Sequence, residues 1–167
     1  LDFAETAAAG VSKILHPGTF IANPVSAAAG ITALGIIETG DACDRASRAA
    51  DELRHRFNEI LARRRLNWAV YGTFSAFHLF MNPRGQRIDP FAFDPHTVPW
   101  SDLKTKPAET VNALRLALLL DGVDISGWPG GLTSAAHTQA DLDATVAAFA
   151  NALDRLAAEG RLPTVPA

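Results

Sequence analysis

The sequence predicts a small α+β layer domain in which two helices cover a mostly antiparallel sheet, preceded by a long helix. Three observations predict this fold class. Apolar residues recur every three or four positions over 41–65, which is typical of an amphipathic helix. A stretch rich in aromatic and β-branched residues follows over 66–82. Two further helical patterns, over 107–122 and 137–160, then enclose short apolar segments, and grouped strands with covering helices indicate an α+β layer.

The first two predicted helices lie before the sheet. Asn23 is a good N-cap and Pro24 suits the first helical position, so a helix begins here and ends near Gly40. Asp41 can cap the longer helix over 41–65. Its predicted apolar face consists of Cys43, Ala46, Ala50, Leu53, Phe57 and Ile60. The arginines of this helix fall mostly off that face, which indicates a solvated side. They are Arg45, Arg48, Arg54, Arg56, Arg63, Arg64 and Arg65.

The remaining segments alternate between strand and helix patterns. Gly72 breaks the stretch over 66–82, which predicts two strands or one strand with a bulge. Residues 83–102 carry four prolines without a steady period and are predicted to form a long surface loop. The segments 123–126 and 132–136 are predicted to be short strands around a Gly-rich turn. Thr138 and Asp141 have capping-box spacing at the start of the last helix.

Composition excludes several classes of function. The chain of 167 residues has a net charge of −3, which provides no electrostatic footprint for nucleic acid or for an anionic membrane. No apolar run approaches the roughly 18 residues that a membrane span needs. The single cysteine excludes an internal disulfide and is compatible with a cytoplasmic location. Five scattered histidines leave little for a metal site, and we predict none.

The segment HPGTFIANPVSAAAG, residues 16–30, has the pattern of an anion-binding loop. Gly18 permits a tight turn with outward-facing N–H groups, and Thr19 adds a hydroxyl donor just before a helix N-terminus. These donors favour a phosphate or a carboxylate. From the residues alone, an ordinary turn and cap remains the alternative.

Other polar residues provide weaker candidates, each with a structural alternative. A loop or strand role is expected for the histidines, a solvated position for the loop arginines, and burial as a small hydrophobe for the cysteine. These residues are His16, His78, His137, Arg84, Arg87 and Cys43. None of them forms a complete catalytic set.

Four segments resemble the class III aminotransferases, which are fold-type I pyridoxal-phosphate (PLP) enzymes. The likeness is greatest to the glutamate-1-semialdehyde 2,1-aminomutase branch. The segments are HPGTFIANPVSAAAGITAL, VYGTFSAFHLFM, LRLALLLDGVDIS and LTSAAHTQADLDATVAAF, between His16 and Leu156. The resemblance implies a C-terminal portion of such an enzyme. Residues 1–40 would be a remnant of the large cofactor domain, 41–65 a linker helix, and 66–167 the small C-terminal domain.

The resemblance also implies a role for the Gly-Thr pair. Gly18 and Thr19 match the residues that bind the phosphate of the neighbouring subunit's PLP, which implies a homodimer acting on a small amino substrate. The Schiff-base lysine of the family has no match, because the lysines here are Lys13, Lys104 and Lys106 and none lies in the required Gly-rich context. We therefore expect no catalytic residue in this chain, and no activity from the chain alone.

Three interpretations of the whole stay open at this point. The leading one is the C-terminal part of an aminotransferase or aminomutase, with an aminomutase favoured by the branch of the likeness. The alternatives are a non-catalytic remnant that dimerises or binds a partner, and a phosphate-ligand binder that uses the Gly18-Thr19 loop. The N-terminus at Leu1, without a methionine, is interpreted as a cut within a longer protein.

Overall fold

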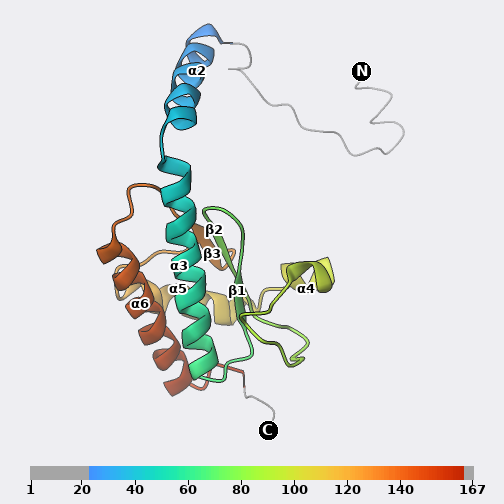
Figure 1. Cartoon of the computed structure of the whole chain (residues 1–167). Helices are drawn as coiled ribbons and strands as arrows, with labels where there is room; N and C mark the ends of the chain where they lie inside the picture. Colours follow the sequence, from blue (N-terminus) through green and yellow to red (C-terminus); the bar gives the residue numbers. More distant parts are fainter. Residues whose placement is uncertain (1–22, 164–167) are drawn as a thin grey trace. The chain divides into compact units, whose positions relative to one another are not determined.

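The computed structural model describes residues 23–163, which fall into two compact units divided between Thr39 and Gly40 (Figure 1). In chain order the elements are α2 (Pro24–Thr39), α3 (Ala42–Arg63), β1 (Ala69–Tyr71), β2 (Ala76–Phe80), the 3-10 helix η1 (Pro95–Thr97), α4 (Trp100–Lys104), α5 (Ala108–Leu119), β3 (Gly130–Leu132) and α6 (Gln139–Ala158). No helix of this part of the chain is long and apolar enough to span a membrane.

The described part of the first unit is the helix α2. The predicted cap is confirmed: the Asn23 side chain accepts from the N–H groups of Val25 and Ser26, at 2.9 and 3.2 Å. None of the helix's residues is buried. Its exposed large apolar side chains are Val25, Ile31, Leu34, Ile36 and Ile37. The helix therefore has an apolar surface without a partner among the described residues.

The second unit is built on a three-stranded antiparallel sheet in the order β1-β2-β3. In its register Val70 pairs with Leu79, and His78 pairs with both Tyr71 and Gly130. The polypeptide turns between β1 and β2 just after Tyr71, so the aromatic stretch forms two strands. Gly72 is required in this turn, because an added β-carbon would lie 2.3 Å from the Ala76 carbonyl oxygen.

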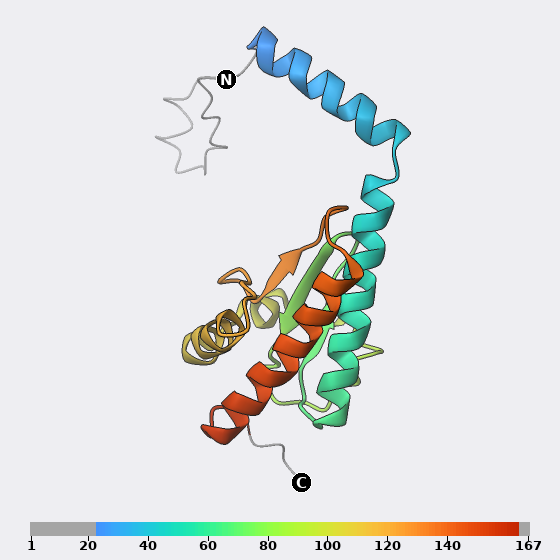
Figure 2. The same ribbon diagram turned by 90° about the vertical axis from the view of Figure 1, so that its left-hand side faces the viewer.

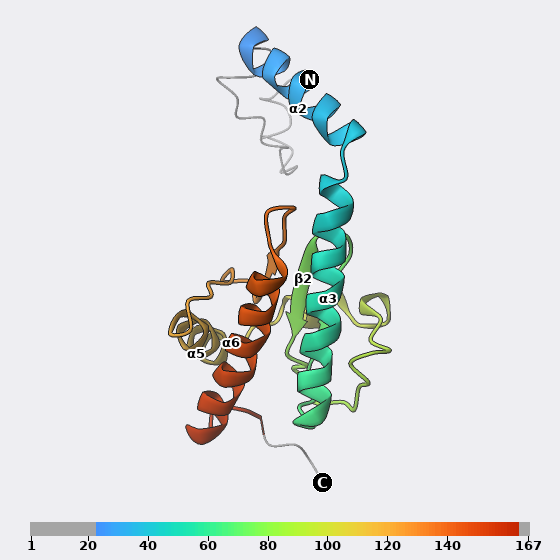
Figure 3. The ribbon, with the colours of Figure 1, turned by 60° about the vertical axis from the view of Figure 1, so that its left-hand side comes forward.

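Helices cover one face of the sheet. Helix α3 packs on β1 and β2, α6 packs beside α3, and α5 packs against α6 (Figures 2 and 3). Large, fully buried side chains from these helices and from the segment before β1 meet at the centre, namely Ile60, Leu61, Trp68, Leu114, Leu118, Leu153 and Leu156. The predicted α+β fold with a small antiparallel sheet is confirmed. Helix α3 contributes buried side chains to this core. The predicted boundary between a linker over 41–65 and a domain over 66–167 stays a prediction.

The prediction of strands at 123–126 and 132–136 is wrong for most of these residues. The backbone of the first segment bonds to α5 instead: the Val123 N–H donates to Leu118, and the Ile125 carbonyl accepts from Arg115 Nε at 2.8 Å. Only Ser126 forms an isolated bridge, with Gly130. Strand β3 instead uses the two glycines of the predicted turn. Gly130 lies so close to β2 that an added β-carbon would be 2.3 Å from the Phe77 carbonyl oxygen.

Two smaller predictions are also corrected. The segment 83–102 is not loop throughout, since η1 and the start of α4 lie within it. Cys43 is exposed rather than buried, because burial along α3 begins one turn later, at Ala46. There the Thr133 hydroxyl donates to the Ala46 carbonyl at 2.6 Å, at the edge where the sheet meets the helix.

The predicted cap of the last helix is confirmed. The Asp141 backbone N–H donates to the Thr138 hydroxyl oxygen at 3.3 Å, and the Asp141 carboxylate accepts from the Thr138 N–H at 2.7 Å. Both orphan donors at this helix start are thereby satisfied.

Candidate functional site

The predicted phosphate loop, with Gly18, Thr19 and His16, lies outside the described residues, as does Lys13. The neighbouring helix start is described. Pro24 has no N–H, the next two N–H groups donate to the Asn23 side chain, and the Ala27 N–H donates to the Asn23 carbonyl at 2.9 Å. The mouth of α2 therefore has no free backbone donor in its first turn.

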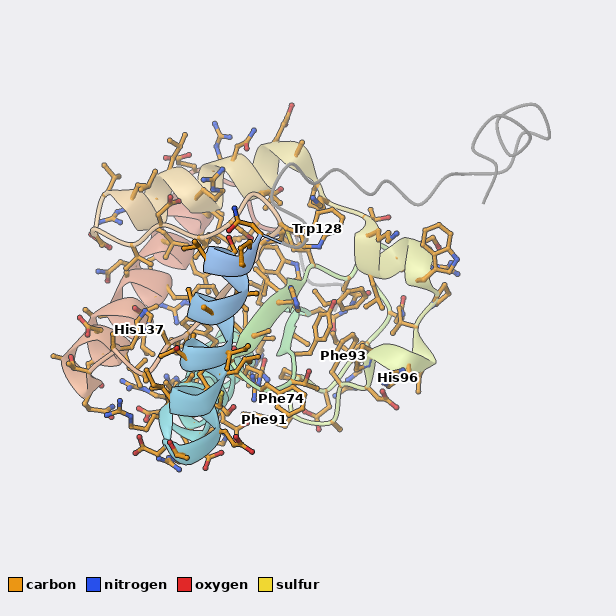
Figure 4. All side chains as sticks on the ribbon, turned by 90° about the horizontal axis from the view of Figure 1, so that it is seen from above. Phe74, Phe91, Phe93, His96, Trp128 and His137 are labelled. Carbon is orange, nitrogen blue, oxygen red and sulfur yellow. The ribbon has the colours of Figure 1, made fainter. Side chains whose placement is uncertain are left out.

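One candidate among the described residues is a hollow of about 540 Å³ beside the β1–β2 hairpin. Its walls come from α3, from the hairpin and from the loop around η1. Its polar lining residues are Asp51, Arg54, His55, Asn58, Tyr71, Thr73, His78 and His96. Figure 4 shows Phe93 and His96 on the side of the unit that carries α4 and Phe91 beside Phe74, whereas His137 lies on the side of α6.

Aromatic side chains build the wall of this hollow. The ring of Phe93 stacks on Phe80 with centroids 4.7 Å apart, and its other neighbour is Tyr71 at 5.4 Å. Tyr71 in turn lies 5.6 Å from the imidazole of His78. Burial raises the pKa of the Tyr71 hydroxyl above its ordinary value, so this group is a neutral hydrogen-bond donor at physiological pH.

The charged groups of the hollow are already engaged by the fold. Arg54 Nη1 donates to the carbonyl oxygens of Phe74 and Ala76, at 3.1 and 2.6 Å, and Nη2 pairs with Asp51 at 2.7 Å. Asn58 is satisfied in both directions by the Val70 backbone. His55 Nε2 lies 3.3 Å from the Glu59 carboxylate. Among the described residues, the polar lining groups without a hydrogen-bond partner are therefore the hydroxyls of Tyr71 and Thr73 and the imidazoles of His78 and His96.

Arg54 is a residue that reasoning from the sequence missed. It was assigned to the solvated side of the helix, but only 13% of its side chain is exposed. Its position on α3 gave no signal of this contact, because the hairpin that covers it is 20 residues further along the chain. The sequence also did not predict that Tyr71, Phe93 and His96 line this hollow, because they too come from segments that are far apart in the chain.

A second hollow, of about 850 Å³, lies between α5, α6 and β3. Its polar side chains also have structural partners. Arg115 Nη2 pairs with Asp124 at 3.1 Å, the Ser134 N–H donates to His137 Nδ1 at 2.9 Å, and Asp141 caps α6. The predicted structural role of His137 is thus confirmed. The imidazole of His78 also lines this hollow and has no hydrogen-bond partner among the described residues.

The other predicted candidates are also accounted for. Arg84 pairs with the buried carboxylate of Asp102, at 2.5 Å, rather than facing a substrate. Arg87 is exposed in the loop. Lys104 and Lys106 lie over the rings of Trp100 and Trp128, at 4.8 and 3.1 Å from the centroids. Within residues 23–163 no group of His, Cys, Asp or Glu could hold a metal ion.

With this geometry in place, the chain can be compared with known proteins. No protein-family model matches it. The glutamate-1-semialdehyde 2,1-aminomutase of Methanopyrus kandleri is 30% identical over 146 residues, which is 86% of this chain and 31% of that protein. A solved transaminase with PLP bound has a TM-score of 0.65 at 27% identity, covering 89% of this chain and 31% of that one. An omega-transaminase from Sphaerobacter thermophilus has a TM-score of 0.62 at 28% identity, covering 84% of this chain and 30% of that one.

The fold and these similarities indicate the class of enzyme to which the chain is related. The chain corresponds to a C-terminal portion of a PLP-dependent aminotransferase, as the resemblance in the sequence predicted. Its sequence relatives include another glutamate-1-semialdehyde 2,1-aminomutase, that of Methanococcoides burtonii, which is 28% identical over 83% of the chain. The chain spans about 31% of the length of the curated relative from Methanopyrus kandleri.

Proposed function

We propose that this chain is the C-terminal part of a PLP-dependent enzyme that moves an amino group on a small amino-acid-like substrate. The observation that carries this proposal is a likeness to aminomutases that extends over 86% of the chain. The agreement of the fold with two solved transaminases at 27 and 28% identity supports it.

We infer that Gly18 and Thr19 hold the phosphate of PLP bound to the neighbouring subunit of a homodimer. The capped start of α2 supports the assignment of this task to the loop, because the helix mouth itself has no free donor in its first turn. When bound, PLP would supply an electron sink for a substrate carbanion. The chain's own residues would contribute phosphate donors and the walls of the small domain.

The reactive lysine must come from outside this sequence. Lys104 and Lys106 lie over tryptophan rings, and neither has the Gly-rich surroundings of the family's lysine. Lys13 also lacks that Gly-rich context, so the 167-residue chain by itself should be inactive. Both an aminomutase, which moves the amino group within one molecule, and a transaminase, which passes it between two, fit this chain.

A cytoplasmic location agrees with the single cysteine.

The experiment that tests this function begins with the intact mass of the natural polypeptide. A mass well above 17.8 kDa is expected, together with PLP that remains bound through dialysis and becomes irreversibly attached to a lysine of the polypeptide after treatment with borohydride. The 167-residue chain serves as the control and should retain none. A natural polypeptide of 17.8 kDa that binds no PLP would contradict the proposal and favour the non-catalytic remnant.

A further inference from the structure

The turn between β1 and β2 exposes a phenylalanine in an unusual backbone conformation. Phe74 has a φ of 49°, in the left-handed region that bulky residues rarely occupy. The residue is 81% exposed, so its ring stabilises nothing inside the unit. Strain of this kind persists only where the surrounding structure enforces it, and it concentrates at binding and switch sites.

The turn is held from two sides. From α3, Arg54 donates to the carbonyl oxygens of Phe74 and Ala76. From the end of β3, the Thr133 N–H donates to the Ser75 carbonyl at 2.8 Å. The ring is therefore presented by a fixed backbone, and little conformational freedom would be lost when a partner binds it.

The two sequence neighbours of the ring are polar and uncharged. Thr73 and Ser75 flank it in sequence, and the nearby carboxylate of Asp51 is paired with Arg54. A second aromatic residue of the same side, Phe91, is 53% exposed and lies 5.6 Å from the ring of His55. Figure 4 labels both phenylalanines at the hairpin end of the unit. Exposed aromatic side chains on a rigid turn fit an apolar socket on another protein surface.

We propose that Phe74 anchors this unit to the larger, cofactor-bearing portion of the aminotransferase, with its ring seated in an apolar pocket of that portion. The chain matches only 31% of the length of its aminomutase relative and of a solved transaminase. Most of such a protein thus lies outside the matched part, and we assign that larger portion as the partner of this surface. The proposal rests on the proposed function.

The test compares Phe74→Asn in the 167-residue chain with the same change in the full-length natural polypeptide, both without added cofactor. Asparagine tolerates the left-handed conformation, so the change relieves strain. In the chain alone Tm should rise by about 2–4 °C. In the full-length protein Tm should fall by a similar amount, with faster proteolysis between its portions, because the anchor is lost. Phe74→Tyr, which keeps the ring, should resemble the wild type in both.

Leu120→Asn is the matched control. Leu120 is 74% exposed and has an ordinary helical φ of −61°, so its replacement should act alike in both proteins. A Phe74→Asn change that shifts Tm in the same direction in both proteins would overturn the docking proposal. That result would leave the proposed function standing, since the thermal readout involves no PLP. A natural polypeptide without any further portion would overturn both, and its mass alone reveals that case.

Discussion

The guanidinium of Arg54 connects helix α3 to the hairpin turn through two carbonyl oxygens, 3.1 and 2.6 Å away. With Arg54→Met the apolar stem is kept, but both carbonyls lose a charged donor. Bonds of this type contribute about 2 kcal/mol, so we expect the free energy of unfolding of the 167-residue chain to fall by about that much in urea.

Arg48→Met is the control for this change, because Arg48 is exposed on the same helix. Its replacement should alter the free energy of unfolding by less than about 0.5 kcal/mol. Equal effects of the two variants would show that the contacts of Arg54 do not stabilise the fold.

Single residues also mark where sequence reasoning reaches its limit. Spacing along α3 correctly assigned Leu53, Phe57 and Ile60 to the buried face, because helical periodicity fixes which side chains share a face. It could not tell that the hairpin covers Arg54 or that burial begins only at Ala46, and so it placed Cys43 wrongly. The burial of Arg54 and the exposure of Cys43 depend on contacts between residues that are far apart in the sequence.

Among the elements, strand β3 depends on glycines where the sequence suggested a turn. At Gly130 an added β-carbon would meet the backbone of Phe77 at 2.3 Å and of His78 at 3.1 Å, and backbone cannot move aside as a side chain can. Gly130→Ala should therefore lower the free energy of unfolding by about 1–3 kcal/mol. Thermal unfolding of the chain measures this.

Gly127→Ala tests whether the effect is specific to the strand. Its nearest neighbour would be the guanidinium of Arg115 at 3.6 Å, an ordinary contact with a side chain. This variant should be close to neutral. If Gly130→Ala is equally harmless, the close approach of β3 to β2 is not as described.

Helix α6 is the element whose stability should depend on acid. The Thr138 backbone N–H and hydroxyl hold the pKa of Asp141 below its ordinary value, and Arg155 does the same for Asp121 of the adjoining turn. A carboxylate with a lowered pKa in the folded state stabilises the fold above its ordinary pKa of 3.8, and this contribution is lost as pH falls through the folded-state value. Stability should thus fall below about pH 4.

Asp141→Asn checks the sign. The variant cannot titrate at this position, so its free energy of unfolding should depend less steeply on pH in the acid range than that of the wild type. Thr138→Ala should cost about 1 kcal/mol at neutral pH through loss of the cap. Unchanged acid dependence in Asp141→Asn would exclude this carboxylate as a contributor.

For the whole molecule, the sequence predicted more of the architecture than of the site. The helices at 24–39, 42–63, 108–119 and 139–158 were predicted closely, since each has a cap or a clear apolar period. The strand at 123–126 was not formed, because α5 and Arg115 bind its backbone. The aromatic hollow beside the hairpin brings together three separate segments, and no local pattern could have shown it.

At this scale the proposed PLP site provides the last prediction. In the full-length polypeptide, Thr19→Val keeps the shape of the threonine side chain and removes its hydroxyl donor. A hydrogen bond to a charged phosphate is worth about 1.5–3 kcal/mol, so the Kd for PLP should rise by about 10-fold or more. Titration of the apoprotein with PLP, followed by the quenching of protein fluorescence, measures this change.

The described helix α2 offers a matched control in Thr32→Val. The hydroxyl of Thr32 donates to the Ala28 carbonyl at 3.0 Å within the helix, and so it has no part in an anion site. Its replacement should leave the Kd for PLP unchanged. If the phosphate is bound across a dimer, the loss caused by Thr19→Val should also appear in mixed dimers, at the site opposite the altered subunit. An equal Kd for both variants would remove Thr19 from the site and return the Gly-Thr pair to the role of an ordinary turn.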